Sequence, residues 1–69
     1  MVHNGERTLK LTDYPKVTVS GAPGWTEFTG WLITEFQPAG SGRKGVVCAE
    51  FDGKIETNVF DMAYVYEEL

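Results

Sequence analysis

The stretch that decides the fold runs from residue 44 to residue 59 and reads Lys-Gly-Val-Val-Cys-Ala-Glu-Phe-Asp-Gly-Lys-Ile-Glu-Thr-Asn-Val. Its centre is Asp52-Gly53, and a type I′ turn needs positive φ at both central residues, which Asp-Gly adopts at little cost. The sequence therefore predicts a two-residue hairpin in which Phe51 pairs with Lys54 and each further pair lies one residue farther from the turn. The alternation along both strands predicts a core face formed by Val46, Cys48, Ile55, Thr57 and Val59.

Strand and turn signals also surround this hairpin. Residues 16–20 and 25–37 alternate apolar with polar side chains at a period of two, and residues 65–69 close the chain as a short strand. Gly30, inside the second of these segments, indicates a bulge or a close backbone approach. Asp61 is placed to cap one helical turn through Met62, Ala63 and Tyr64, and so short a turn favours 3-10 geometry.

Five short strands, one tight hairpin and one helical turn before the last strand predict an all-β chain, a small five-stranded SH3-like barrel. A five-stranded OB-fold is the main alternative. That fold usually has a longer helix between its third and fourth strands, where the Asp-Gly turn leaves no room. Residues 16–69 form the predicted barrel, and residues 1–15, where Leu9 and Leu11 alternate with polar side chains, are predicted as an N-terminal arm or an edge strand.

The charge of the chain is acidic and uneven. Its 69 residues carry ten acidic and six basic side chains, a net charge of −4. A domain of this length has a thin core, and the chain is too short for the large enzyme folds. Direct nucleic-acid binding is disfavoured, because phosphate contacts need clustered Lys and Arg. We expect an acidic surface, serving either solubility or a basic partner, in residues 50–69, where Lys54 accompanies Glu50, Asp52, Glu56, Asp61, Glu67 and Glu68.

Residue types for metal binding or nucleophilic catalysis are scarce. His3 and Cys48 are the only histidine and the only cysteine, so we expect no metal site, no internal disulfide and no Ser/His/Asp triad. Cys48 is expected to be a small buried side chain. A single cysteine, the lack of a signal-peptide pattern and the lack of an apolar run of ~20 residues predict a cytoplasmic protein without a membrane span.

Aromatic residues are more numerous than so small a core can hold, at 13% of the chain. Exposed aromatic side chains on a small barrel indicate a binding surface or an oligomer interface. Trp31, Phe36 and Phe51 are predicted in the core. Trp25, in a Gly/Pro loop, and Tyr66, in an acidic last strand, fit a surface role and a core role equally well.

Two motifs extend across residues 17–66: Ser20-Gly21-Ala22 followed by Gly30-Trp31 and Thr34, and the run Thr57-Asn58-Val59-Phe60-Asp61-Met62-Ala63. Together they resemble the plasmid-borne, trimethoprim-insensitive type II dihydrofolate reductases, whose corresponding run is Val-Gln-Ile-Tyr-Pro-Val-Ala. The resemblance implies an SH3-like barrel, four copies of which surround one pore that binds folate and NADPH side by side.

By this resemblance, Asn58, Val59 and Phe60 correspond to the family's glutamine, isoleucine and tyrosine at the pore floor. Thr18 corresponds to the lysine that attracts the anionic ligands. Asn58 is one methylene shorter than glutamine, Phe60 has no hydroxyl group, and Thr18 has no charge. Because folate and NADPH are polyanions, a ring of acidic protomers would repel them.

Two hypotheses follow. The first is a small cytoplasmic SH3-like interaction module without catalytic residues or a cofactor. It would bind a protein partner, or another copy of itself, through an aromatic and acidic surface. By analogy alone, small proteins of this kind include phage- or plasmid-encoded regulators and inhibitors. The alternative is a type II dihydrofolate reductase-like oxidoreductase, acting as a homotetramer with NADPH. The candidate binding residues are Trp25, Asn58, Val59, Phe60, Tyr66, Glu67 and Glu68.

Overall fold

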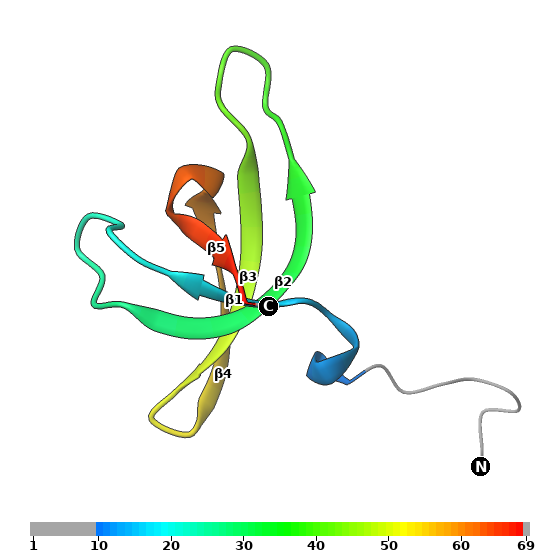
Figure 1. The fold of residues 1–69 in the computed structure, drawn as a ribbon, viewed down its shortest axis with the longest axis vertical. Helices are drawn as coiled ribbons and strands as arrows, with labels where there is room; N and C mark the ends of the chain where they lie inside the picture. Colours follow the sequence, from blue (N-terminus) through cyan, green and yellow to red (C-terminus); the bar gives the residue numbers. More distant parts are fainter. Residues whose placement is uncertain (1–9, 69) are drawn as a thin grey trace, which may run out of the picture.

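A computed structural model describes residues 10–68 of the chain and confirms the predicted all-β fold. A 3-10 turn near the N-terminus precedes the first strand, and a second one precedes the last strand (Figure 1). The elements are η1 (Leu11–Asp13), β1 (Lys16–Val19), β2 (Phe28–Phe36), β3 (Lys44–Phe51), β4 (Lys54–Asp61), η2 (Met62–Tyr64) and β5 (Val65–Glu67).

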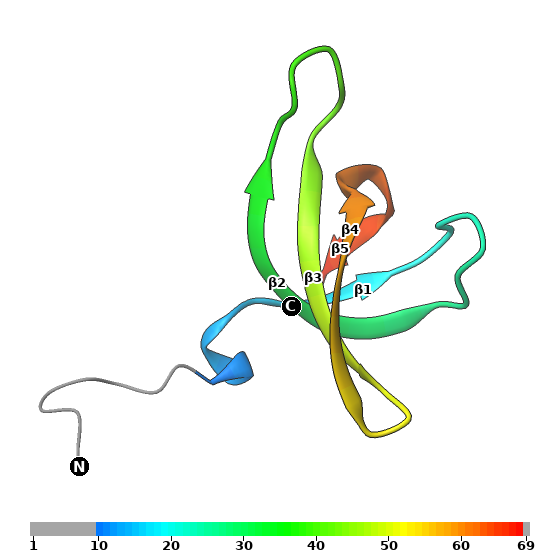
Figure 2. The same ribbon diagram turned by 180° about the vertical axis from the view of Figure 1, so that it is seen from behind.

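The five strands form one antiparallel sheet in the order β4-β3-β2-β1-β5. The long β2 curves, so that its first half lies beside β1 and its second half beside β3 (Figures 1 and 2). The chain then returns through η2 and adds β5 to the free side of β1. This is the topology of a small SH3-like barrel, as the sequence predicts. The sheet stays open, because β4 and β5 end the strand order without pairing to each other in the described residues.

The hairpin has the geometry that Asp52-Gly53 predicts. Asp52 has φ +52° and Gly53 has φ +81°, the two positive angles of a type I′ turn. Phe51 pairs with Lys54, and the register continues without a shift to Lys44 opposite Asp61. The predicted pairing of these two strands is therefore confirmed at every position.

Gly53→Val is expected to lower the free energy of unfolding by about 1–2 kcal/mol, because a β-branched residue resists positive φ. Thermal denaturation measures the effect. Thr57→Val is the control, since it adds the same side chain to the same hairpin where the backbone is extended. Equal melting temperatures for Gly53→Val and the wild type would contradict the requirement for glycine in this turn.

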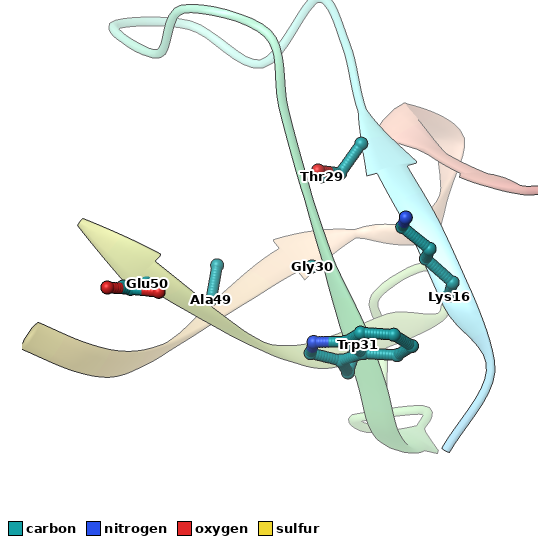
Figure 3. Close-up of a pocket in the computed structure, with 6 residues that line it drawn as sticks. All are labelled: Lys16, Thr29, Gly30, Trp31, Ala49 and Glu50. Carbon is teal, nitrogen blue, oxygen red and sulfur yellow. The ribbon is translucent and has the colours of Figure 1, made fainter. Parts of the chain in front are cut away.

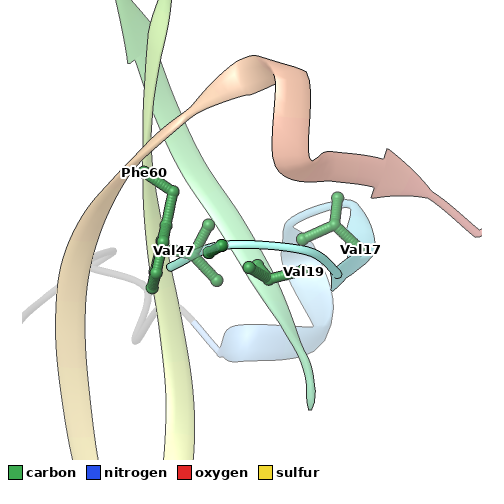
Figure 4. Packing of buried hydrophobic residues seen from close by; sticks show 5 residues of the cluster. Val17, Val19, Val47 and Phe60 are labelled. Atoms are coloured by element: carbon green, nitrogen blue, oxygen red, sulfur yellow. The ribbon is translucent and has the colours of Figure 1, made fainter. Parts of the chain in front are cut away.

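The core lies on one face of the sheet, here called the inner face, which carries Val17 and Val19 of β1, Val47 of β3 and Phe60 of β4 (Figure 4). Ala22 completes the buried cluster, and the partly buried side chains packed against it are Phe28, Leu32, Tyr64 and Val65. The opposite, outer face carries Trp31, Cys48, Ile55 and Val59, because directly opposed residues of antiparallel strands share a face.

The predicted core face of the hairpin is therefore wrong, although its register is right. Ile55 and Val59 are 59% and 55% exposed, whereas Phe60 is 5% exposed. Both faces of the hairpin carry apolar residues, and the inner face prevails because it buries the large ring of Phe60 opposite Gly45. Cys48 is buried as predicted, but it lies on the outer face opposite Trp31 and outside the core cluster.

Gly30 and Ile33 shape the curvature of β2. A Cβ atom at Gly30 would lie 2.7 Å from the carbonyl oxygen of Cys48, so β2 and β3 meet at a distance that only glycine permits. This close approach is the one predicted for Gly30. The bulge lies three residues further on, where the register shifts between Leu32 and Thr34.

The sequence predicts the second of the two 3-10 turns but not the first. Between β4 and β5, η2 follows the prediction, and the Asp61 carboxylate accepts a hydrogen bond from the Ala63 N–H at 3.0 Å. Near the N-terminus, Leu11 lies in η1 rather than in a strand. Leu9, the other residue on which the predicted edge strand depends, lies outside the described residues.

Candidate functional site

An aliphatic surface lies along the outer face of β4. Ile55 and Val59 are the exposed large aliphatic side chains of the described residues, and the exposed Thr57 lies between them. We call these three residues the β4 strip. Val46, on the neighbouring β3, pairs with Val59 and is half-buried. The strip is therefore the rim of an apolar surface that continues onto β3.

The backbone of the same three residues faces away from the sheet. In a two-residue hairpin, Phe51 and Lys54 exchange both of their hydrogen bonds, and bonded pairs recur at every second residue. Lys54, Glu56, Asn58 and Phe60 thus direct their N–H and C=O groups toward β3. The groups of Ile55, Thr57 and Val59 point outward, where no strand of the described residues pairs with them. The β4 strip combines exposed apolar side chains with free backbone donors and acceptors.

Of the three residues that correspond to the reductase pore floor, one is on this surface. Val59 belongs to the β4 strip, whereas Asn58 is half-buried on the inner face and Phe60 is in the core. A surface role for Phe60 is therefore wrong, because its ring packs against the rings of Trp25 and Phe28. Thr18, at the position of the family's lysine, donates a hydrogen bond from its hydroxyl group to the Glu68 carboxylate.

Trp25 belongs to an aromatic cluster with Phe28, Phe51 and Phe60. Its ring centroid lies 5.0 Å from that of Phe60 and 5.5 Å from that of Phe28, and Phe51 is 5.9 Å away. At 39% exposure it is the outermost member of this cluster, so it has both a packing role and a surface. Of the aromatic residues predicted in the core, Phe51 is half-buried in this cluster. The prediction is wrong for Trp31, which is half-buried on the outer face, and for Phe36, which is 44% exposed.

The remaining candidates lie at the opposite end of the strand order. Tyr66, Glu67 and Glu68 are exposed in and just after β5, and Tyr66 pairs with Thr18 of β1. The exposed residues among the predicted binding residues therefore lie in three separate places: Val59 in the β4 strip, Trp25 in the loop before β2, and Tyr66, Glu67 and Glu68 in or just after β5. Asp61 is used within the fold, since it caps η2 and lies 3.8 Å from the Lys44 ammonium group.

A second feature, on the outer face of the sheet, is a hollow of about 310 Å³ (Figure 3). Lys16, Trp31 and Glu50 stand around it in the view of Figure 3, and the Lys16 ammonium group lies 5.8 Å from the centroid of the Trp31 ring. The other residues that line it are Thr29, Gly30 and Ala49. Sequence reasoning found neither this hollow nor the exposure of Ile55, which it assigned to the core.

No group of three or more His, Cys, Asp or Glu side chains within residues 10–68 is arranged to hold a metal ion. Within the same range, no helix is long and apolar enough to cross a membrane. Comparisons of the chain with protein-family models, with curated proteins and with solved structures found no match.

Proposed function

We propose that the chain is an SH3-like interaction module that binds a protein partner by adding a strand of that partner to β4. The supporting observation is the β4 strip, where exposed aliphatic side chains and free backbone groups occur on the same three residues. In strand addition, the backbone hydrogen bonds supply affinity and the alternate side chains supply specificity. A β4 with eight residues, no proline and an apolar outer face lacks several features that protect edge strands from pairing.

The charge of the protein indicates which partners the strip would attract. With a net charge of −4, and with Glu56 in the middle of β4, the module favours a strand that carries basic residues. Opposite charges bring such partners together faster and exclude acidic ones. The exposed Glu67 and Glu68 of the β5 end add to the same field.

Thr57→Pro tests this proposal. Proline removes the outward N–H of Thr57 while leaving the hydrogen bonds between β3 and β4 in place. Partners captured from the native cytoplasm by the wild type are expected to be reduced at least about tenfold with Thr57→Pro, while Thr57→Ala keeps them. Circular dichroism verifies that both variants are folded. Equal capture by the two variants, or capture of no partner by the wild type, would contradict the proposal.

A second pair of variants examines the side chains of the strip. Ile55→Lys with Val59→Lys is expected to abolish capture, because each buried aliphatic side chain contributes about 1.5–3 kcal/mol to an interface. Thr12→Lys with Thr26→Lys adds the same charge at two exposed positions outside β4 and should leave capture unchanged.

The native mass of the wild type addresses the reductase alternative. A tetramer that oxidises NADPH only in the presence of dihydrofolate would support that alternative, and a monomer or dimer would contradict it.

A further inference from the structure

The sheet divides between β2 and β3. Their pairing ends at Trp31 opposite Cys48. Beyond that pair, Phe28, Thr29 and Gly30 of β2 pair with β1 alone, and Ala49, Glu50 and Phe51 of β3 pair with β4 alone. Figure 3 shows the two strands diverging, with the hollow at the fork.

Two residues direct backbone groups into this fork. Leu32 donates its N–H to the Pro15 carbonyl on the β1 side, so the alternate residues Thr29 and Trp31 face β3. On β3, the backbone N–H and C=O groups of Phe51 point toward β4, where they bond to Lys54. Because these groups alternate in direction along a strand, those of Cys48 and Glu50 point toward β2. The next bonded pair after Trp31 and Cys48 would be Thr29 with Glu50, and the division of the sheet prevents it. The N–H and C=O groups of both residues therefore border the hollow without a ladder partner in the described residues.

The side chains around the hollow give it two charged sides and a small floor. Gly30 and Ala49 form the small floor of the hollow, and the half-buried Trp31 forms an aromatic wall. The Lys16 ammonium group lies over this wall, and the Glu50 carboxylate stands on the other strand. Lys16 and Glu50 are exposed, and neither forms an ion pair within residues 10–68. One side of the hollow therefore attracts an anion and the other a cation.

We propose that the hollow binds a short extended peptide segment of a partner protein, with an acidic side chain directed to Lys16 and a basic side chain directed to Glu50. An extended peptide supplies the alternating N–H and C=O groups that the backbones of Thr29 and Glu50 can pair with. Its alternate side chains lie on one face, so an acidic and a basic residue two positions apart can reach both charges. A simple anion such as phosphate would be repelled by Glu50. The volume is at the lower end of the about 300–1,000 Å³ typical of ligand sites, which suits a short segment.

Blocked pentapeptides provide the probe. Acetyl-Thr-Lys-Thr-Asp-Thr-amide and its order-reversed form acetyl-Thr-Asp-Thr-Lys-Thr-amide are titrated into the ¹⁵N-labelled full chain. One of the two is expected to shift the amide resonances of Thr29 and Glu50 and to bind about tenfold more tightly than the other and than the neutral acetyl-Thr-Gln-Thr-Asn-Thr-amide. Absence of shifts at Thr29 and Glu50 with every peptide would overturn the proposal. Equal shifts with free lysine or free aspartate would assign the hollow to a small molecule instead.

A charge exchange gives the decisive variant. The double variant Lys16→Glu with Glu50→Lys keeps the composition and is expected to reverse the preference between the two charged peptides, again about tenfold. Lys54→Glu with Glu56→Lys makes the same exchange on β4 and should keep the wild-type preference. An unchanged preference in the first variant would overturn the proposal. Because Thr57→Pro alters the β4 edge only, its effect on capture and the result for the hollow are independent of each other.

Discussion

Phe60→Ala is expected to lower the free energy of unfolding by about 3–5 kcal/mol, the range for removing a buried aromatic ring. The Phe60 side chain is 5% exposed and belongs to the buried cluster with Val17, Val19 and Val47. Its ring centroid lies 5.0 Å from that of Trp25 and 5.6 Å from that of Phe28. The loss of the ring therefore removes transfer energy and also leaves a cavity between β4 and the loop that holds Trp25.

The size of the protein makes this loss critical. A domain is stabilised by about 0.05–0.15 kcal/mol per residue, or about 3–10 kcal/mol for a chain of this length. For domains of this size, 1 kcal/mol corresponds to about 4–8 °C in melting temperature. We expect Phe60→Ala to melt at least about 12 °C below the wild type or to lose its cooperative transition. Thermal and urea denaturation followed by circular dichroism measure this.

Two control variants separate the burial of Phe60 from the chemistry of the substitution. Phe36→Ala deletes the same ring where the side chain is 44% exposed, and Val59→Ala changes the adjacent residue on the outer face of β4. Each is expected to cost less than about 1 kcal/mol. A larger loss at Val59 than at Phe60 would restore the core face that the alternation of the hairpin predicts.

The hairpin was predictable because its information is local. Asp52-Gly53 determines the turn, the two-residue turn determines the register, and Phe51 opposite Lys54 then determines every later pair. The capped turn before β5 is local in the same sense, since Asp61 accepts a hydrogen bond from the N–H of Ala63, only two residues away. No distant contact is needed for either element.

The buried face of the hairpin was not predictable in this way. Ile55 and Val59 alternate on one face, while Val47 and Phe60 occupy the other, so the period of two cannot choose between them. Contacts between residues distant in sequence decide which face is buried. Trp25, in the loop before β2, and Phe28, the first residue of β2, pack their rings against that of Phe60. The family resemblance identifies Val59 as a site residue, whereas its exposure follows from this long-range packing.

The hollow depends on the division of the sheet, which no residue pattern shows. Thr29 and Glu50 are ordinary strand residues in the sequence, and they border the same fork only because β2 turns from β3 toward β1. The one local signal is Gly30, which indicates that two backbones meet there. Lys16 and Glu50 are more than 30 positions apart in the chain, and only the complete topology shows that they line the same hollow.

Gly30→Ala is expected to lower the free energy of unfolding by about 2–3 kcal/mol. The added Cβ atom would lie 2.7 Å from the carbonyl oxygen of Cys48 and 3.0 Å from side-chain carbons of Ala49 and Val47. The carbonyl oxygen belongs to the pair that joins β2 to β3 at Trp31, so it cannot move without loosening that junction. Urea denaturation measures the loss, and the amide resonances of Trp31 and Cys48 report the shift of the two strands.

The sign of the change in the free energy of unfolding, when alanine replaces glycine, distinguishes a close approach of two strands from a position with free space. At a site with space for a methyl group, replacing glycine by alanine stabilises a protein by about 0.4–1 kcal/mol, because the unfolded chain loses conformational freedom. Gly42 is such a site, since the nearest atom to an added Cβ is the Asp61 Oδ2 at 4.0 Å. Gly42→Ala should therefore be neutral or stabilising while Gly30→Ala is destabilising. If both variants were stabilised, the result would contradict the close approach of β2 and β3 at Gly30, and with it the division of the sheet that forms the hollow.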